Sequence, residues 1–462
     1  MSVHMPTRPI ASRFVFRGSR RAPAFSVSAL LRAGAWSLIG LLAACGDRGR
    51  ESAETKAETK IAATAVSAQA ITRASEWRLP APAGAAQPDL VIAPDGRRLL
   101  SWVEPATGGA HRLRLAWSDN AGWQAPITIA EGNDWFLNWA DTPHVQALPD
   151  GSLWAHWLRS TGPSRMDYGI DLVRSGDGGR SWSVPQLVHP AGTRGDHGFV
   201  TFWTQAEDQL GIAWLDSRQK AAAGPDHSAD AAHDGAHHGG GGAMMLRAAL
   251  YGAQARPLAE WPLDASTCDC CTTSSAITDR GVVVVYRGRT AGEIRDTRIV
   301  RFDGRAWTAP RDVHTDGWHM PACPVNGPVV AARGHDVWVA WYTEAGGMPE
   351  LRAAHSGDAG DHFDAPITLA RGGQVLGRLG LALGDGRLLV SWLEESGASG
   401  QRIVLGTYDL RWQSATRVEV ATLAARGRAS GMPRLRWADG AAWLVWTDVH
   451  DGKPRLKGAS VR

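Results

Sequence analysis

The first 45 residues lack acidic side chains, and they lack an apolar run long enough to span a membrane. They hold six arginines and then the apolar stretch Ala33 to Leu42, which is about half of the roughly 20 residues that a membrane helix needs. A basic segment, a short apolar segment and small residues before Cys45 are typical of an export signal. We therefore expect residues 1–45 to be a signal peptide.

The run Leu42-Ala43-Ala44-Cys45-Gly46 resembles the processing box of bacterial lipoproteins. The resemblance implies that Cys45 is acylated and becomes the mature N-terminus. The alternative is an ordinary signal peptide with an incidental cysteine. Gly46 stands where an acidic residue is associated with inner-membrane retention, which favours the outer membrane. We expect a cell-envelope protein that its Cys45 lipid anchors to the membrane.

The mature chain also lacks an excess of positive charge. Six of the 49 Lys and Arg residues precede Cys45, which leaves 43 against 46 acidic residues. Nucleic-acid binding requires clustered positive charge, so we expect no nucleic-acid partner. Residues 46–74 have almost no large apolar side chain and are expected to form a flexible tether. The folded domain is then predicted to occupy residues 75–462.

An apolar strand that follows a turn and ends in an aromatic residue recurs seven times. These strands end at Trp102, Trp157, Trp214, Tyr286, Trp341, Trp392 and Trp446, at intervals of 55, 57, 72, 55, 51 and 54 residues. A regular period with alternating apolar residues is typical of radial or stacked β architectures. Long helices are excluded, because glycine, proline and β-branched residues recur too often.

Each repeat has room for four short strands, as a propeller blade does. In the second repeat we expect them at about 140–147, 153–158, 169–174 and 184–189. The last repeat stops after its third strand, and residues 75–80 are predicted to supply the fourth. The sequence thus predicts an all-β, seven-bladed β-propeller whose ring is closed by an N-terminal strand, which removes exposed sheet edges.

Two turns, 175–182 and 356–363, share the pattern Ser-x-Asp-x-Gly-x-x-Trp/Phe, and Ser118 to Trp123 is a shortened version. Their Ser and Asp side chains are expected to cap backbone N–H groups, while the glycine adopts an unusual φ. The pattern resembles the Asp-box, or bacterial neuraminidase repeat, of the sialidase family. The resemblance to that family covers nearly all of the mature chain. Sialidases usually have six blades, so a six-bladed ring is the alternative. The scaffold alone does not imply sialidase activity.

Strands alternate in direction, so the second-to-third connection of each blade and the connection to the next blade share one face. The two patterned turns lie on the opposite face, and we expect ligand binding on the first. Its candidate ligand-binding residues are Arg194, Arg218, Arg287, Arg295, Arg378, Arg428, Trp135, Trp318 and Asn326.

Four cysteines fall on this face, Cys268, Cys270 and Cys271 before the fourth repeat and Cys323 before the fifth. One interpretation is disulfides, because an exported protein meets an oxidising compartment and the number is even. The other is a thiolate site for a copper or zinc ion, with His319 as a neighbouring ligand. The His-rich insertion 219–242 is expected to be a solvated loop, or else a weak chelator.

By the resemblance, a sialidase-type glycosidase uses a Tyr/Glu nucleophile pair, an Asp acid/base and three arginines around a substrate carboxylate. Tyr286, Glu293 and Asp196 are the candidates here, although Tyr286 also fits as a packing residue. The family's Arg-Ile-Pro motif is absent from the first blade. We expect a protein that binds a metal, small-molecule, anionic or glycan ligand, with exo-α-sialidase activity as the alternative. A purely structural envelope protein is a third option.

Overall fold

The computed structural model describes residues 73–119, 122–222, 243–397, 400–413, 416–424 and 426–462. All described residues belong to one compact unit, residues 67–462. The predicted signal peptide, Cys45 and most of the His-rich insertion lie outside the described residues. No helix in the described part of the chain is long and apolar enough to cross a membrane.

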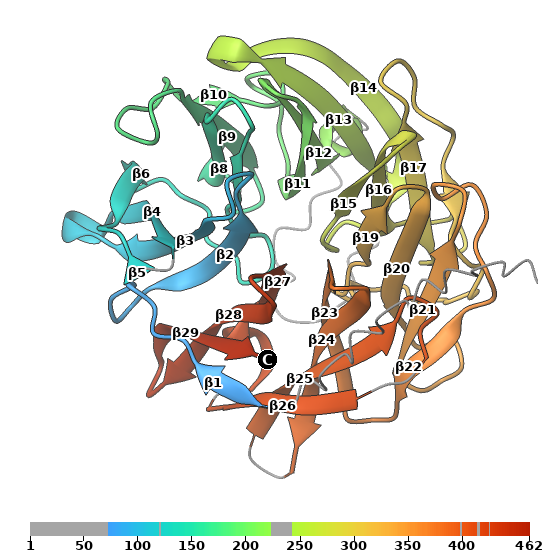
Figure 1. The fold of residues 1–462 in the computed structure, drawn as a ribbon. Coiled ribbons are helices and arrows are strands. Elements are labelled where there is room, and N and C mark those ends of the chain that lie inside the picture. The colour runs from blue at the N-terminus through green and yellow to red at the C-terminus, as the bar shows by residue number, and fades with distance from the viewer. Residues whose placement is uncertain (1–72, 120–121, 223–242, 398–399, 414–415, 425) are drawn as a thin grey trace, which may run out of the picture. The chain divides into compact units, whose positions relative to one another are not determined.

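The described residues form seven antiparallel sheets in a ring, which is a seven-bladed β-propeller (Figure 1). The first strand of each blade lies innermost, and it contacts the first strands of both neighbouring blades. These seven strands line an axial cavity of about 480 Å³. They are β2 (Ala86–Ile92), β7 (Val145–Ala147), β11 (His197–Ala206), β15 (Ser274–Thr278), β19 (Val329–Arg333), β23 (Val375–Gly384) and β27 (Arg434–Ala438).

Each blade continues outwards through a second, a third and an outer strand. The second strands are β3 (Arg98–Pro105), β8 (Leu153–Ser160), β12 (Gln209–Asp216), β16 (Gly281–Arg287), β20 (Asp336–Thr343), β24 (Arg387–Ser396) and β28 (Ala441–His450). The third strands are β4 (His111–Asp119), β9 (Tyr168–Ser175), β13 (Met244–Gly252), β17 (Thr297–Phe302), β21 (Glu350–Ser356), β25 (Gly400–Asp409) and β29 (Lys453–Val461). The outer strands are β5 (Gly122–Trp123) with β6 (Ile127–Gly132), β10 (Gln186–Leu187), β14 (Arg256–Thr267), β18 (Arg311–Asp312), β22 (Ile367–Arg371), β26 (Thr416–Leu423) and β1 (Ala74–Glu76). The other described elements are α1 (Arg218–Ala222) and three 3-10 turns, η1 (Thr107–Gly109), η2 (Ala253–Ala255) and η3 (Gly427–Ser430).

The N-terminal strand completes the seventh blade, as the sequence predicted. β1 pairs antiparallel with β29, with Ala74 opposite Val461. Just after it, the Trp77 N–H donates to the carbonyl of Gly458 at 2.9 Å. The Trp77 ring packs on Trp123 of the first blade and Trp443 of the seventh, with centroids 4.9 and 4.6 Å away. Trp77 therefore links the two blades at which the ring closes.

Seven hydrophobic clusters hold the ring together, one at each junction between neighbouring blades. In β16, Val284 and Tyr286 face the third blade, while Val283 and Val285 face the fifth. Both faces of a second strand are covered, because successive side chains of a strand point to opposite sides. All seven aromatic residues of the repeat lie on second strands and are at most 5% exposed, which explains their recurrence.

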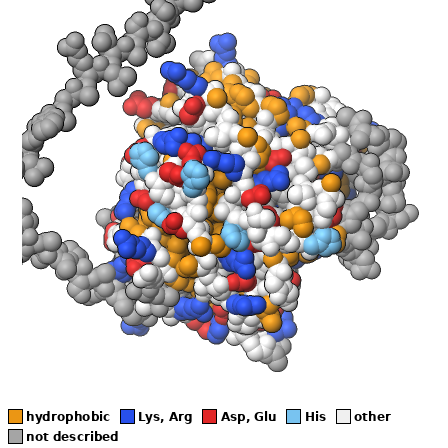
Figure 2. Space-filling view, turned by 90° about the vertical axis from the view of Figure 1, so that its right-hand side faces the viewer, with side chains coloured by type: hydrophobic (Ala, Val, Ile, Leu, Met, Phe, Trp, Pro, Cys, Tyr) orange, Lys and Arg blue, Asp and Glu red, His pale blue; other side chains and the backbone are white. Residues whose placement is uncertain are grey.

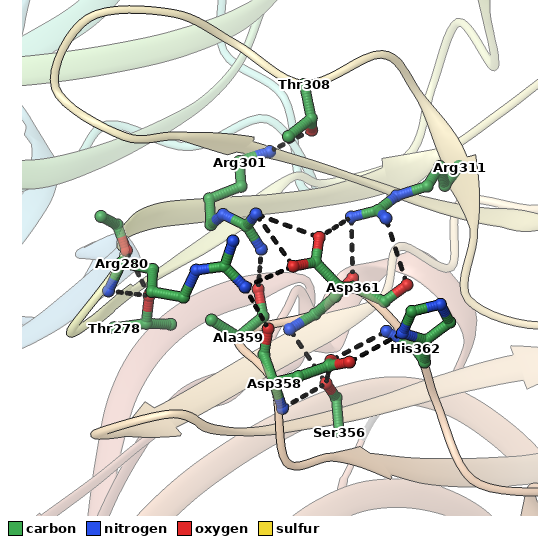
Figure 3. A network of polar contacts seen from close by, with 12 residues as sticks. Thr278, Arg280, Arg301, Thr308, Arg311, Ser356, Asp358, Ala359, Asp361 and His362 are labelled. Carbon is green, nitrogen blue, oxygen red and sulfur yellow. Dashed lines mark hydrogen bonds and ion pairs between the residues drawn. The ribbon is translucent and has the colours of Figure 1, made fainter. Parts of the chain in front are cut away.

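The turn between β21 and β22 clamps two blades on the face where the patterned turns lie. The Ser356 Oγ accepts the Gly360 N–H at 2.9 Å, and Asp358 accepts the His362 N–H at 2.8 Å. The neighbouring Asp361 pairs with three arginines of the fourth blade (Figure 3). These are Arg280 at 2.5 Å, Arg301 at 3.0 Å and Arg311 at 2.7 Å.

On the side of the molecule shown in Figure 2, basic and acidic side chains are interspersed.

Candidate functional site

The face opposite the patterned turns carries the candidate site, and we call it the loop face. It comprises the connections that follow the second and the outer strand of each blade. Those with candidate residues are 133–144, 188–196, 217–222, 268–273, 288–296, 313–328 and 424–433. They converge, because Trp139, Phe199, Cys270, Val325 and Met432, from different connections and strands around the ring, pack in one hydrophobic cluster.

Several residues on this face have a left-handed backbone conformation, with a positive φ. Gln87, Phe199 and Arg378 have φ of 55°, 52° and 56°, and each stands at a register shift in an inner strand. Val325, in the connection before β19, has a φ of 49°. A β-bulge bends a strand and re-aims its side chain. The repeated bulge thus turns these residues out of the regular pleat at the loop-face end of their blades.

The four domain cysteines lie together. The Cys268 sulfur is 3.6 Å from that of Cys271 and 3.9 Å from that of Cys270, and all three lie within 4.8 Å of one another. The Cys268 N–H is fixed by the carbonyl of Arg287 at 2.9 Å. Cys323 comes from the next connection, and its thiol interacts with that of Cys270. No pair of these cysteines is bonded as a disulfide, so the disulfide prediction is not confirmed.

Thiolate character is concentrated on Cys268. Hydrogen bonds from the Cys270 and Cys271 thiols, together with the nearby Arg295 guanidinium, hold the pKa of Cys268 well below its usual range. The same hydrogen bond to Cys268 raises the pKa of Cys270, while burial raises that of Cys271. A hydrogen bond with Cys270 lowers the pKa of Cys323. Cys268 is therefore the cysteine of this buried group whose ionisation its surroundings favour.

A chain of ion pairs borders the cysteines. Lys220 pairs with Asp269 at 2.8 Å, and Arg289 lies 3.5 Å from the same carboxylate. Arg289 continues to Glu293 at 2.6 Å, and Glu293 pairs with Arg295, also at 2.6 Å. Lys220 was not among the sequence candidates, because its position within an insertion gave no sign that it reaches the neighbouring connection. This chain fixes the Asp269 carboxylate beside the thiols.

The proposed sialidase trio is not held together by its hydrogen bonds. Tyr286 is fully buried, and its hydroxyl donates to Asp264 at 2.7 Å, which fits the packing alternative. Burial and the Asp264 carboxylate raise the pKa of the tyrosine well above its usual range. Glu293 is held by two arginines, and Asp196 lies 3.8 Å from Lys220. Burial raises the pKa of Asp196 above its usual value. Their catalytic roles stay predictions.

Three of the six candidate arginines, Arg218, Arg287 and Arg295, are already satisfied within the protein. Arg218 pairs with Asp216 at 2.7 Å. Arg287, which is 2% exposed, donates to the carbonyl of Asn326 at 2.7 Å and to two further carbonyls. Arg194 is exposed, and its backbone carbonyl accepts a hydrogen bond from Ser217. Guanidinium groups that are committed to internal partners have few donors left for a ligand.

Arg378 and Arg428 differ from these. Both lie against the Trp139 ring, 4.6 and 5.8 Å from its centroid. Arg378 donates to Ser430 at 2.8 Å, and among the described residues neither arginine has a carboxylate at ion-pair distance. Burial and the neighbouring Arg428 lower the pKa of Arg378 to about 10. Trp139 was missed from sequence, although an aromatic residue in the polar stretch around Asn138 was a usable signal.

The remaining candidates support the face rather than open onto a shared pocket. Trp135 stacks on Trp157 with centroids 5.6 Å apart. Trp318 is 3% exposed, and its backbone N–H donates to the Asp296 carboxylate at 3.0 Å. His319 is exposed, and none of its side-chain contacts within the described ranges joins it to a cysteine.

Comparisons with known proteins find resemblance in structure alone. No family model and no curated protein matches the chain. A polysaccharide lyase described as an ulvan lyase matches with 13% identity and a TM-score of 0.42, over 72% of this chain and 80% of that one. A mutant NanB sialidase from Streptococcus pneumoniae matches with 10% identity and a TM-score of 0.43, over 79% and 83%. An α-L-arabinofuranosidase from Fusarium graminearum matches with 12% identity and a TM-score of 0.42, over 82% and 93%. At this level of similarity the matches carry no argument about activity.

Proposed function

We propose that the propeller binds a soft metal ion, copper(I) or zinc, at Cys268, Cys270 and Cys271. The observation that carries the proposal is the spacing of the sulfurs, 3.6 and 3.9 Å from the sulfur of Cys268. Two thiolates on one zinc ion stand about 3.8 Å apart, which follows from Zn–S bonds of about 2.3 Å at the tetrahedral angle. The cluster is thus close to the geometry of a loaded site before any metal binds.

The surroundings suit such an ion. Thiolates select soft ions over magnesium or calcium. Arg295 lies beside Cys268 and favours its thiolate, which is the form that binds metal. The Asp269 carboxylate is tied up by Lys220 and Arg289, so the donors facing the ion are sulfurs. Cys323 is a free, exposed thiol that interacts with that of Cys270, and it is available as a further ligand.

The same proposal includes a place in the cell envelope. The basic segment, the short apolar stretch and the small residues before Cys45 support export and acylation at that cysteine. A Cys45→Ser variant is expected to lose the lipid mass and to fractionate away from membranes. Recovery of that variant in the outer-membrane fraction, like the parent, would remove the anchoring part of the proposal.

The metal proposal is tested with purified protein. One equivalent of zinc or copper(I) per chain should survive gel filtration of the reduced protein, as measured by mass spectrometry of the metal. Cys271→Ser should lose that metal, while Cys45→Ser, a cysteine change outside the cluster, should keep it. A thiol titration of the protein freshly purified without metal is the second measurement. If no thiol reacts there, the four cysteines are disulfide-bonded and the proposal fails.

A second candidate is binding or cleavage of a carboxylate-bearing glycan. The observation that favours it is the pair Arg378 and Arg428, which lie on Trp139 and have no carboxylate at ion-pair distance among the described residues. Guanidinium forks suit carboxylates, and aromatic rings suit sugar faces. A fluorogenic sialoside assay tests the glycosidase alternative. Turnover that Glu293→Gln abolishes would support it, and absence of turnover would leave binding alone.

A further inference from the structure

The four thiols of the cluster differ in their access to solvent. Cys268 and Cys271 are each 1% exposed, Cys270 is half-buried, and Cys323 is exposed. The Cys270 sulfur lies 3.9 Å from that of Cys268 and within 4.8 Å of that of Cys271, and an interaction with the Cys323 thiol contributes to the raised pKa of Cys270. The thiols therefore form a path that runs from the protein interior to its surface.

The sulfurs of Cys268, Cys270 and Cys271 are sufficient to hold one kind of ion. Three sulfurs within 4.8 Å of one another can surround a copper(I) ion in a plane, whereas structural zinc is almost always held by four ligands. The fourth sulfur, Cys323, belongs to a separate connection between β18 and β19. Its position makes it a ligand that a solvent-borne partner can reach without opening the core.

We propose that the cargo is copper(I), that Cys268, Cys270 and Cys271 hold it, and that Cys323 exchanges it with a thiolate-bearing donor or acceptor. This inference rests on the proposed metal-binding function. In each exchange a copper–sulfur bond to Cys323 forms as the bond to the donor thiolate breaks. The incoming Cys323 thiol releases its proton and the departing thiolate takes one up. Copper remains copper(I), so no oxidant or reductant is needed.

The test uses the mature chain, the glutathione complex of copper(I) as donor, and a colorimetric copper(I) chelator as acceptor. Cys323→Ser should keep its stoichiometry and its affinity within about threefold, while transfer in stopped flow slows by about tenfold or more. Cys271→Ser should lose affinity by about 100-fold or more. Thr315→Ala, an exposed change in the connection that carries Cys323, is the control and should transfer at the parent rate.

The outcomes separate the two proposals. Transfer by Cys323→Ser at the parent rate would overturn the exchange role. If Cys323→Ser lost as much copper(I) affinity as Cys271→Ser, the exchange role would also be overturned, because Cys323 would then be a permanent fourth ligand. Tighter binding of zinc than of copper(I) by the parent would overturn the choice of cargo. If the reduced parent binds neither ion, the proposed function itself fails.

Discussion

Asp141 is a carboxyl group whose ionisation the fold opposes. It is 2% exposed, one oxygen accepts the Phe199 N–H at 2.7 Å, and the other has no hydrogen-bond partner among the described residues. Burial raises its pKa from 3.8 to about 7. Between about pH 4 and pH 7 the Asp141 carboxyl of the folded protein keeps a proton that the unfolded chain releases. The free energy of unfolding therefore falls as pH rises through this range.

The expected size of this effect is on the order of 2 kcal/mol between pH 5 and pH 8. Asp141→Asn, which stays neutral, should flatten the pH dependence of the unfolding free energy measured by urea denaturation. Asp150→Asn, in a turn on the opposite face, is the matched control and should keep the parent slope. An unchanged slope in Asp141→Asn would contradict the raised pKa.

Single residues also mark the limit of what the sequence could predict. The nine ligand-binding candidates were chosen by residue type and by face, and their role in binding stays a prediction. Whether an arginine is free depends on partners such as Asp216 for Arg218 and Asn326 for Arg287, which are two and 39 residues away in the chain. The bulges at Gln87 and Phe199 were not predicted either, because neither residue favours a positive φ.

At the scale of elements, the patterned turn after β21 acts as a clamp between blades. Asp361 joins Arg280, Arg301 and Arg311, of which Arg301 is 7% exposed on its side chain (Figure 3). Removing the carboxylate leaves a nearly buried guanidinium without its charged partner, which is costly. The cost is moderated by the exposure of the other two arginines.

Asp361→Asn should therefore lower the free energy of unfolding by about 1–2 kcal/mol, as measured by chemical denaturation. Metal binding on the loop face should be unchanged. Asp364→Asn is the matched control, because its side chain is 76% exposed and pairs only at the surface with His355. That control should change stability by less than about 0.5 kcal/mol. Equal effects of the two variants would count against the clamp.

At the scale of the whole molecule, ring closure depends on a short N-terminal segment. β1 has three residues, and Trp77 adds ring contacts to both the first and the seventh blade. Trp77→Ala should lower the free energy of unfolding by about 2–3 kcal/mol, because two aromatic contacts and their buried area are lost. It should also speed proteolysis near both ends of the domain.

Glu76→Ala, an exposed neighbour on β1, is the control for that measurement. Its protease resistance should match the parent. If Trp77→Ala were as stable and as resistant as Glu76→Ala, closure would rest on strand pairing alone, and the linking role of the tryptophan would be wrong.

The ring itself was predictable because its signal is repeated. Seven aromatic strand ends at a near-constant interval predicted seven blades, and a truncated last repeat predicted that residues near Ser75 complete it. The site was predictable only in part. Topology placed the cysteines on one face, but the 3.6 Å approach of Cys268 and Cys271 depends on backbone conformation within one short connection, for which the sequence has no repeated signal.

X-ray absorption of the copper-loaded protein tests the central claim most directly, that the loop-face cysteines form a soft-metal site. The account predicts at least three sulfur neighbours of the copper at about 2.2–2.3 Å, and their number should fall in Cys271→Ser. A first shell made of nitrogen or oxygen, or an unchanged sulfur shell in that variant, would contradict it.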